Sequence, residues 1–181
     1  LLVFLEREKG RFLIERGPDW WTILYFMFLF STAACLEYTG VTAKFARFIY
    51  LMGERLPLKN FGEWGRTGNA LLMLLWGSGL LSGFVDNLPI VAALVPVVKA
   101  LALHGLPNAH ILWWSLLIGG CFGGNLTMIG STANLVAIGV YERQFRQKFL
   151  FRDWIRLGAI VTLSSLTVAS VLLILMLILG I

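Results

Sequence analysis

The sequence predicts an all-α membrane protein, a bundle of transmembrane helices, and three observations support this fold class. The 181 residues are 58% hydrophobic, and their mean hydropathy is +0.80. Only 14% are charged, against about 25% in an ordinary soluble domain. Four runs carry no charge at all, namely 20–36, 67–85, 100–141 and 157–181. Since a helix needs about 20 apolar residues to cross a bilayer, each run is long enough to cross or enter a membrane.

We divide the chain, taken as a single membrane domain over residues 1–181, into five units. In chain order they are a span at 20–37, an interfacial amphipathic segment and loop at 39–66, a helical hairpin at 67–104, a long unit at 111–140 and a last span at 157–181. Trp20 and Trp21 suit a membrane–water interface at the start of the first span. The segment that follows is spaced like an amphipathic helix lying along the membrane surface. Its apolar face consists of Val41, Phe45, Phe48 and Ile49.

The net charge of +5 reflects basic loops rather than a nucleic-acid surface, because the 15 Lys and Arg residues cluster between the apolar runs. If 111–140 crosses the membrane once, residues 1–19 and 142–156 lie on the same face of the membrane and 39–66 lies on the other. The first two segments hold four and five basic residues, and 39–66 holds five. Nine against five favours the first face as cytoplasmic. This predicts a multi-pass integral protein of the cytoplasmic (inner) membrane with its C-terminus outside. Because the chain begins without an initiator Met, we expect a piece of a longer protein.

Residues 119–134, GGCFGGNLTMIGSTAN, interrupt the 111–140 unit with glycines and polar side chains. Each glycine lowers helix propensity by about 1 kcal/mol relative to Ala. Five polar side chains follow within ten residues, on Asn125, Thr127, Ser131, Thr132 and Asn134. One interpretation is a broken helix whose free N–H and C=O groups bind ions. The other is a continuous helix with a GxxxG packing face. The length of the unit and the density of polar groups favour the break.

Asp86 stands in the middle of the apolar stretch GLLSGFVDNLPIVAALVP, residues 79–96. A charge at the bilayer centre costs roughly 2.5–3.5 kcal/mol and usually has a function. The spacing also fits an ordinary surface turn at DNLP, because 67–85 is long enough for one full helix and Asp, Asn and Pro favour turns. The residues by themselves leave both interpretations open.

Two ordered motifs resemble the second half of permeases of the ion transporter superfamily. This group includes citrate-transporter-like, arsenite-pump and sodium/proton-antiporter permeases and the divalent anion/sodium symporters. The first motif is SGFVDNLPIVAALVP, with matches at Ser82, Asp86, Asn87 and Pro89. The second is GGNLTMIGSTANLVAIG, with matches at Gly123, Gly124, Thr127, Ile129, Gly130 and Asn134. The resemblance covers most of 20–181. It implies a re-entrant helical hairpin whose tip meets a broken helix at mid-membrane, in the C-terminal half of an inverted-repeat transporter.

The resemblance also implies one substrate or ion site between the two motifs. Its expected residues are Ser82, Asp86, Asn87, Pro89, Gly124, Asn125, Thr127, Gly130, Ser131 and Asn134. A sodium ion would be held by four of them, Asp86, Asn87, Asn125 and Thr127. No cofactor is expected other than a coupling ion, H⁺ or Na⁺.

We therefore expect a secondary active transporter of ions, a proton- or sodium-coupled permease or antiporter working by alternating access. Anion symporters of the superfamily carry Ser-Asn-Thr at the hairpin tip, whereas this chain carries Asp-Asn-Leu-Pro, and a fixed acid repels an anion. A dicarboxylate or citrate-type anion symporter is therefore the alternative.

Two other classes fit less well. A membrane-embedded enzyme needs paired catalytic groups, and only one acid, Asp86, lies inside an apolar run, so we do not expect an enzyme. One central acid between two interrupted elements suits alternating access better than a channel. The expected partners are the lipid bilayer, the N-terminal half of the same transporter and a second copy of the chain in a homodimer, without nucleic acid.

Overall fold

The computed structural model describes residues 19–61 and 64–180, and its regular elements there are all helical. The α-helices are α3 (Trp20–Tyr38), α4 (Val41–Gly53), α5 (Gly65–Ser82), α6 (Asn87–Leu103), α7 (Ile111–Gly123), α8 (Thr132–Phe145) and α9 (Phe151–Leu179). Two short 3-10 helices, η1 (Pro57–Asn60) and η2 (Met128–Gly130), lie between them. The described part of the chain holds no strand, so the predicted all-helical fold class is confirmed.

Two of the described helices are long and apolar enough to cross a membrane. α3 has 19 residues and α9 has 29, which at 1.5 Å per residue correspond to about 28 and 44 Å. α9 begins at Phe151, six residues before the expected start of the last span. α6 and α7 are apolar but shorter. The structure thus provides two candidate spans, and further crossings remain a prediction.

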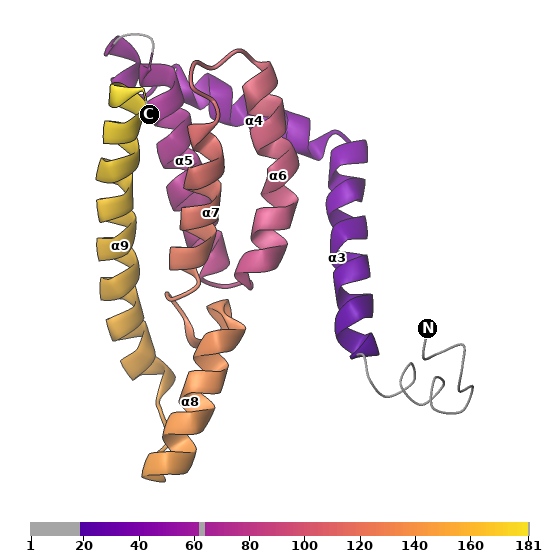
Figure 1. The fold of residues 1–181 in the computed structure, drawn as a ribbon, viewed down its shortest axis with the longest axis vertical. Coiled ribbons are helices and arrows are strands. Elements are labelled where there is room, and N and C mark those ends of the chain that lie inside the picture. Colours follow the sequence, from indigo (N-terminus) through magenta and orange to yellow (C-terminus); the bar gives the residue numbers. More distant parts are fainter. Residues whose placement is uncertain (1–18, 62–63, 181) are drawn as a thin grey trace, which may run out of the picture.

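The core lies where α5, α7 and α9 run side by side (Figure 1). α5 occupies the centre because several of its leucines face both neighbours. The fully buried side chains include Leu71, Leu74 and Leu75 of α5, Leu112 and Leu116 of α7, and Leu166 of α9. This apolar packing fixes the end of α5 against the end of α7, which is where the polar motifs lie.

Glycines let the backbones of α5 and α7 touch near those ends. A Cβ atom on Gly123 would lie 2.0 Å from the carbonyl oxygen of Gly79, and one on Gly119 would lie 2.4 Å from that of Leu75. No side chain larger than hydrogen fits at either position. The small-residue packing face considered above is therefore present, and it runs directly into the break that ends α7.

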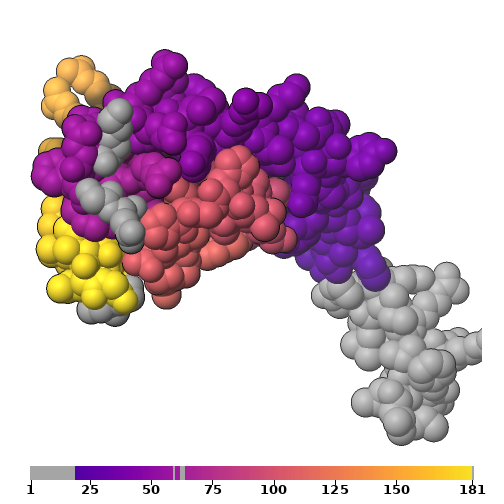
Figure 2. Space-filling view, turned by 90° about the horizontal axis from the view of Figure 1, so that it is seen from above, coloured from indigo at the N-terminus to yellow at the C-terminus, as the bar shows by residue number. Residues whose placement is uncertain are grey.

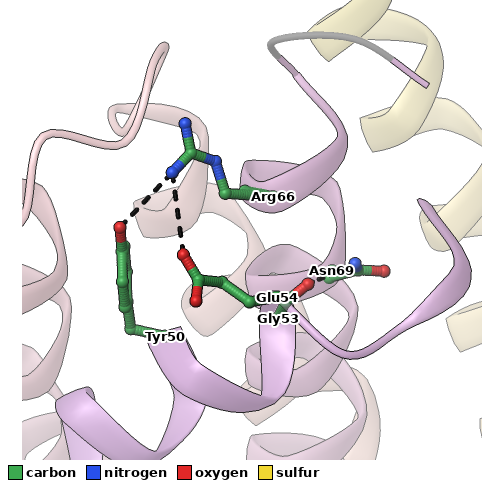
Figure 3. A network of polar contacts seen from close by, with 5 residues as sticks. All are labelled: Tyr50, Gly53, Glu54, Arg66 and Asn69. Carbon is green, nitrogen blue, oxygen red and sulfur yellow. Dashed lines mark hydrogen bonds and ion pairs between the residues drawn. The ribbon is translucent and has the colours of Figure 1, made fainter. Parts of the chain in front are cut away.

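A polar network fixes α4 at the outer end of α5 (Figure 3). The Asn69 side-chain amide is buried and donates to the carbonyl of Gly53, the last residue of α4, at 2.7 Å, and to that of Leu56 at 3.3 Å. The Arg66 guanidinium lies 3.8 Å from the Glu54 carboxylate and 3.4 Å from the Tyr50 hydroxyl. The Asn69 amide thus satisfies carbonyls at the end of α4 and just beyond it, where helical partners are missing.

α4 turns its small residues toward the rest of the protein and leaves most of its bulky apolar residues exposed. Its buried residues are Thr42, Ala46, Ile49 and Gly53, so of the predicted apolar set only Ile49 faces inward. Val41, Phe45 and Phe48 are exposed. The small side chains of Thr42 and Ala46 allow α4 to lie close across the bundle, as the view from above shows (Figure 2). The bulky side chains therefore remain available to lipid.

Two helices carry little protein cover in the described chain. α3 has no buried residue and leans on α4 and α6. It begins after Asp19, whose carboxylate accepts from the Thr22 hydroxyl at 2.6 Å and the Thr22 amide at 3.3 Å. These two hydrogen bonds lower the pKa of Asp19. α8 buries only Asn134 and Ile138. Both helices leave broad apolar faces for lipid or other protein.

The contact between Gly79 and Gly123 generates a stability prediction. We expect Gly123→Ala to lower the thermal stability of the detergent-solubilised protein, because overpacking costs about 1–3 kcal/mol or more and exceeds the helix-propensity gain of about 1 kcal/mol from Gly to Ala. Gly77→Ala is the matched control on α5, since a Cβ there has nothing within 4 Å. Equal melting temperatures for the two variants would contradict this account.

Candidate functional site

The first element of the site is the tip of the α5–α6 hairpin. α5 ends at Ser82 and α6 begins at Asn87, and Asp86 is the residue that precedes the first turn of α6. Asp86, Asn87 and Pro89 are half-buried, whereas Phe84 and Val85 are exposed. Proline is tolerated in the first turn of a helix because its missing N–H has no helical partner there. The sequence DNLP therefore both ends the turn and starts α6.

The second element is the break between α7 and α8. α7 ends at Gly123, η2 covers Met128–Gly130, and α8 starts at Thr132. A helix interruption leaves carbonyls at the end of one half and N–H groups at the start of the other without helical partners. Of the two interpretations of 119–134, the structure shows the broken helix.

Two buried side chains join the hairpin tip to the break by donating to backbone carbonyls, and a third, Asn134, closes the break itself. The Ser82 hydroxyl donates to the Gly120 carbonyl at 2.6 Å. The Thr127 hydroxyl donates to the Gly83 carbonyl and accepts from the Gly130 N–H at 3.1 Å. The Asn134 amide donates to the carbonyls of Gly124 at 2.9 Å and Thr127 at 3.1 Å.

Close backbone contacts accompany these bonds. A Cβ on Gly130 would lie 2.7 Å from the Gly124 carbonyl oxygen and 2.9 Å from the carbonyl oxygens of Gly83 and Ser82. A Cβ on Gly124 would lie 2.9 Å from the carbonyl oxygen of Gly130. Gly124 and Gly130 therefore serve the site by having no side chain, because their backbones fill the space between the tip and the break.

Asp86 itself is held by a residue of the break. The Thr132 hydroxyl donates to Oδ2 of Asp86 at 3.0 Å. Asp86 precedes α6 and Thr132 begins α8, so two helix N-termini meet at this carboxylate. No ion pair to Asp86 occurs among the described residues. The carboxylate has acceptor capacity left for a proton or a cation.

The other predicted residues lie around this point in different roles. The Ser131 hydroxyl accepts from the Ala133 N–H at 3.3 Å and caps α8. No hydrogen bond joins the side chain of Asn87 or Asn125 to Asp86 in the part of the chain that the structure describes. The tip and the break are thus brought together, while the predicted sodium ligand set of Asp86, Asn87, Asn125 and Thr127 remains a prediction.

Sequence reasoning missed residues of α9 that contact the break. The Trp154 indole donates to the Asn125 carbonyl at 3.2 Å, and the Thr162 hydroxyl donates to the Phe122 carbonyl at 3.4 Å. Gly158 lies between them on the helix. Their four-residue spacing is visible in the sequence, but nothing in it indicates that this stripe faces 122–126. Thr132 was counted among the polar residues without being assigned to the site.

Comparisons with known proteins agree with the two motifs. The family model described as "Citrate transporter" matches residues 7–180. A protein named as an uncharacterized transporter in Mycobacterium tuberculosis is 35% identical over 156 residues, 84% of this chain and 34% of its own. An uncharacterized transporter of Synechocystis is 31% identical over 174 residues, 87% of this chain and 36% of its own.

A human protein is also similar to the chain, and all three of these relatives are much longer than the chain. The P protein of Homo sapiens is 34% identical over 173 residues, 93% of this chain and 20% of its own. The chain thus spans about a third of the length of the bacterial relatives and a fifth of the human one. No solved structure matches the chain. With a family model that extends over nearly all of its residues, the chain belongs to the citrate transporter family.

Proposed function

We propose that the chain forms one half of a secondary transporter that moves ions across a membrane by alternating access, with H⁺ or Na⁺ coupled at Asp86. Membership of a transporter family supports the class. The single observation that supports the site is the hydrogen bond between Asp86 at the hairpin tip and Thr132 at the start of α8. It puts a carboxylate at the meeting point of two interrupted elements, as ion sites of secondary transporters require.

Residues next to Asp86 lie against α3, and this contact indicates how deep Asp86 lies in the membrane. Val85 and Pro89 line a groove together with Tyr25, Phe28 and Leu29. The same groove also includes Thr32, Ala33 and Leu36, so its α3 residues lie five to sixteen positions after Trp20, about 8–24 Å along the helix. α6 begins part-way along α3 and not beside its end (Figure 1). If α3 crosses the bilayer, Asp86 lies inside the hydrocarbon layer and the hairpin is re-entrant. A surface turn would instead place Val85 beside an end of α3.

An acid at that depth can alternate between two neutral states. Apolar surroundings disfavour a lone carboxylate, so it must carry a proton or pair with a cation. Competition between these two occupants is the minimum that exchange of H⁺ for Na⁺ needs. Thr132 donates to the ionised carboxylate and stabilises the state that binds the cation. Asn87, Asn125 and Thr127 are the candidates in the motifs to supply further oxygens.

The rest of the transporter belongs to the same proposal. Since the chain spans about a third of its bacterial relatives, the other half would be a topologically inverted repeat from the same protein. α3 and α8 expose apolar faces that such a half, a second copy in a homodimer or lipid would cover. The family's citrate-type substrates make an anion symporter the second candidate, in which a protonated Asp86 and the N-termini of α6 and α8 would face the anion.

We expect Asp86→Asn in the full-length protein to abolish gradient-coupled transport and leave folding intact, because the amide can neither release a proton nor balance a cation. Asp86→Glu should keep partial activity with an altered pH profile. The measurement is Na⁺-gradient-driven pH change inside proteoliposomes loaded with a pH dye, with and without citrate outside.

Asp153→Asn is the matched control, since Asp153 is an exposed acid in the first turn of α9. If Asp86→Asn transports at the normal rate with the normal pH profile, Asp86 is not the coupling acid. Citrate uptake that requires protonated Asp86, in the absence of any exchange of Na⁺ for H⁺, would favour the anion symporter.

The proposed orientation can be measured separately. Single cysteines placed in the α8–α9 loop at Gln147 and after α9 at Gly180, in a background without Cys35 and Cys121, should be labelled from opposite sides of the membrane. Impermeant maleimide should reach Gln147→Cys only from the cytoplasm. The reason is that α9 crosses once, with the basic residues of 142–156 held inside. Labelling of both positions from one side would exclude this topology.

A further inference from the structure

Three residues on one face of α9, in consecutive turns, contact the broken segment. Trp154, Gly158 and Thr162 are spaced by four residues, so they lie on one face of the helix. The Trp154 indole N–H donates to the Asn125 carbonyl at 3.2 Å and the Thr162 hydroxyl to the Phe122 carbonyl at 3.4 Å. Between them, a Cβ on Gly158 would lie 2.5 Å from the Asn125 carbonyl oxygen and 2.7 Å from that of Leu126.

Trp154 differs from the other two because it also contacts the loop that leads into α9. Its ring centroid lies 6.0 Å from that of Phe149, at an interplanar angle of 74°. Phe149 in turn lies edge-on to Tyr141 of α8 at 5.4 Å, and its backbone N–H donates to the Glu142 carboxylate at 2.9 Å. The indole is therefore held in place from the loop side while its N–H reaches the break.

The peptide that Trp154 holds belongs to a predicted ligand. Asn125 and Asn134 line a cavity of about 280 Å³ together with Trp154 and Gly158. The Asn125 carbonyl has left the regular helix, so without the indole it would be free to rotate toward water or a bound cation.

We propose that Trp154 is a positioning residue of the ion site: its indole N–H keeps the Asn125 carbonyl turned toward α9 and thereby sets the cation affinity of the break. This inference rests on the proposed coupling function. A packing role alone would require only the ring, whereas positioning requires the N–H. Trp154→Phe keeps most of the ring and removes that donor.

Trp76 provides a matched control in the same chain. Its indole donates to the Ser170 hydroxyl at 3.0 Å and joins α5 to α9, like Trp154 from a half-buried position, but it contacts no residue of the break. In full-length protein, Trp154→Phe should change the apparent affinity for Na⁺ in proteoliposomes by about five- to tenfold, the effect of one net hydrogen bond, and shift the pH profile. Trp76→Phe should change neither, although both variants lose a buried hydrogen bond.

A spectroscopic readout avoids reliance on transport. In full-length protein labelled with 5-fluorotryptophan, the ¹⁹F resonance of Trp154, assigned with Trp154→Phe or Trp154→Tyr, should shift when Na⁺ is titrated or the pH is lowered. The Trp76 resonance should stay unchanged. This measurement is made on otherwise unaltered protein, so it holds even if one variant folds poorly.

The outcomes separate this inference from the proposed function. The positioning role is overturned if the Trp154 resonance does not shift with Na⁺ or pH, or if Trp154→Phe and Trp76→Phe have equal ion affinities. In that case, loss of coupling in Asp86→Asn would still support the proposed function. A Trp154 resonance that responds to Na⁺ even in Asp86→Asn protein supports the positioning role and assigns the ion to a site without Asp86.

Discussion

The need to satisfy the backbone of an interrupted helix governs this structure. Away from water, each unpaired carbonyl costs several kcal/mol, and the break between α7 and α8 frees several of them at once. Asn134 on α8 and Trp154 on α9 donate to the carbonyls of Gly124 and Asn125. Ser82 at the end of α5 and Thr162 on α9 add a second donor to the carbonyls of Gly120 and Phe122, which also accept backbone N–H groups. No buried side-chain nitrogen or oxygen among the described residues is left without a partner. The break is therefore a built element whose neighbours are placed to support it.

This constraint divides the polar residues of the two motifs into two groups. Ser82, Thr127 and Asn134 are buried, and their donors are already committed to backbone carbonyls. Their first physical role is to keep the tip and the break in register. Asp86, by contrast, is half-buried, and Thr132 is its single hydrogen-bond donor among the residues that the structure describes. A carboxylate with remaining acceptor capacity is the group on which a mobile ion can act.

The sequence predicted the helices and the two motifs because both depend on local signals: uncharged runs, glycine density and turn-forming residues. It could not predict contacts that depend on how helices rotate. The apolar spacing of Val41, Phe45 and Phe48 does not show that small Thr42 and Ala46 face the protein, since α4 lies close across the bundle. Nothing in the sequence marks Trp154 either, and only the packing of Gly158 against 125–126 brings its N–H to the break.

The same packing explains why tip, break and α9 form one unit while α3 remains apart. Gly79 against Gly123, Gly130 against Gly83 and Gly158 against Asn125 are contacts in which no side chain separates the partners. Such interfaces cannot slide without overlap of backbone atoms, so relative motion within this unit is costly. α3 meets α6 through larger side chains along a groove, where sliding exchanges one apolar contact for another. Sliding of α3 along α6 is therefore less costly than sliding within the unit of tip, break and α9.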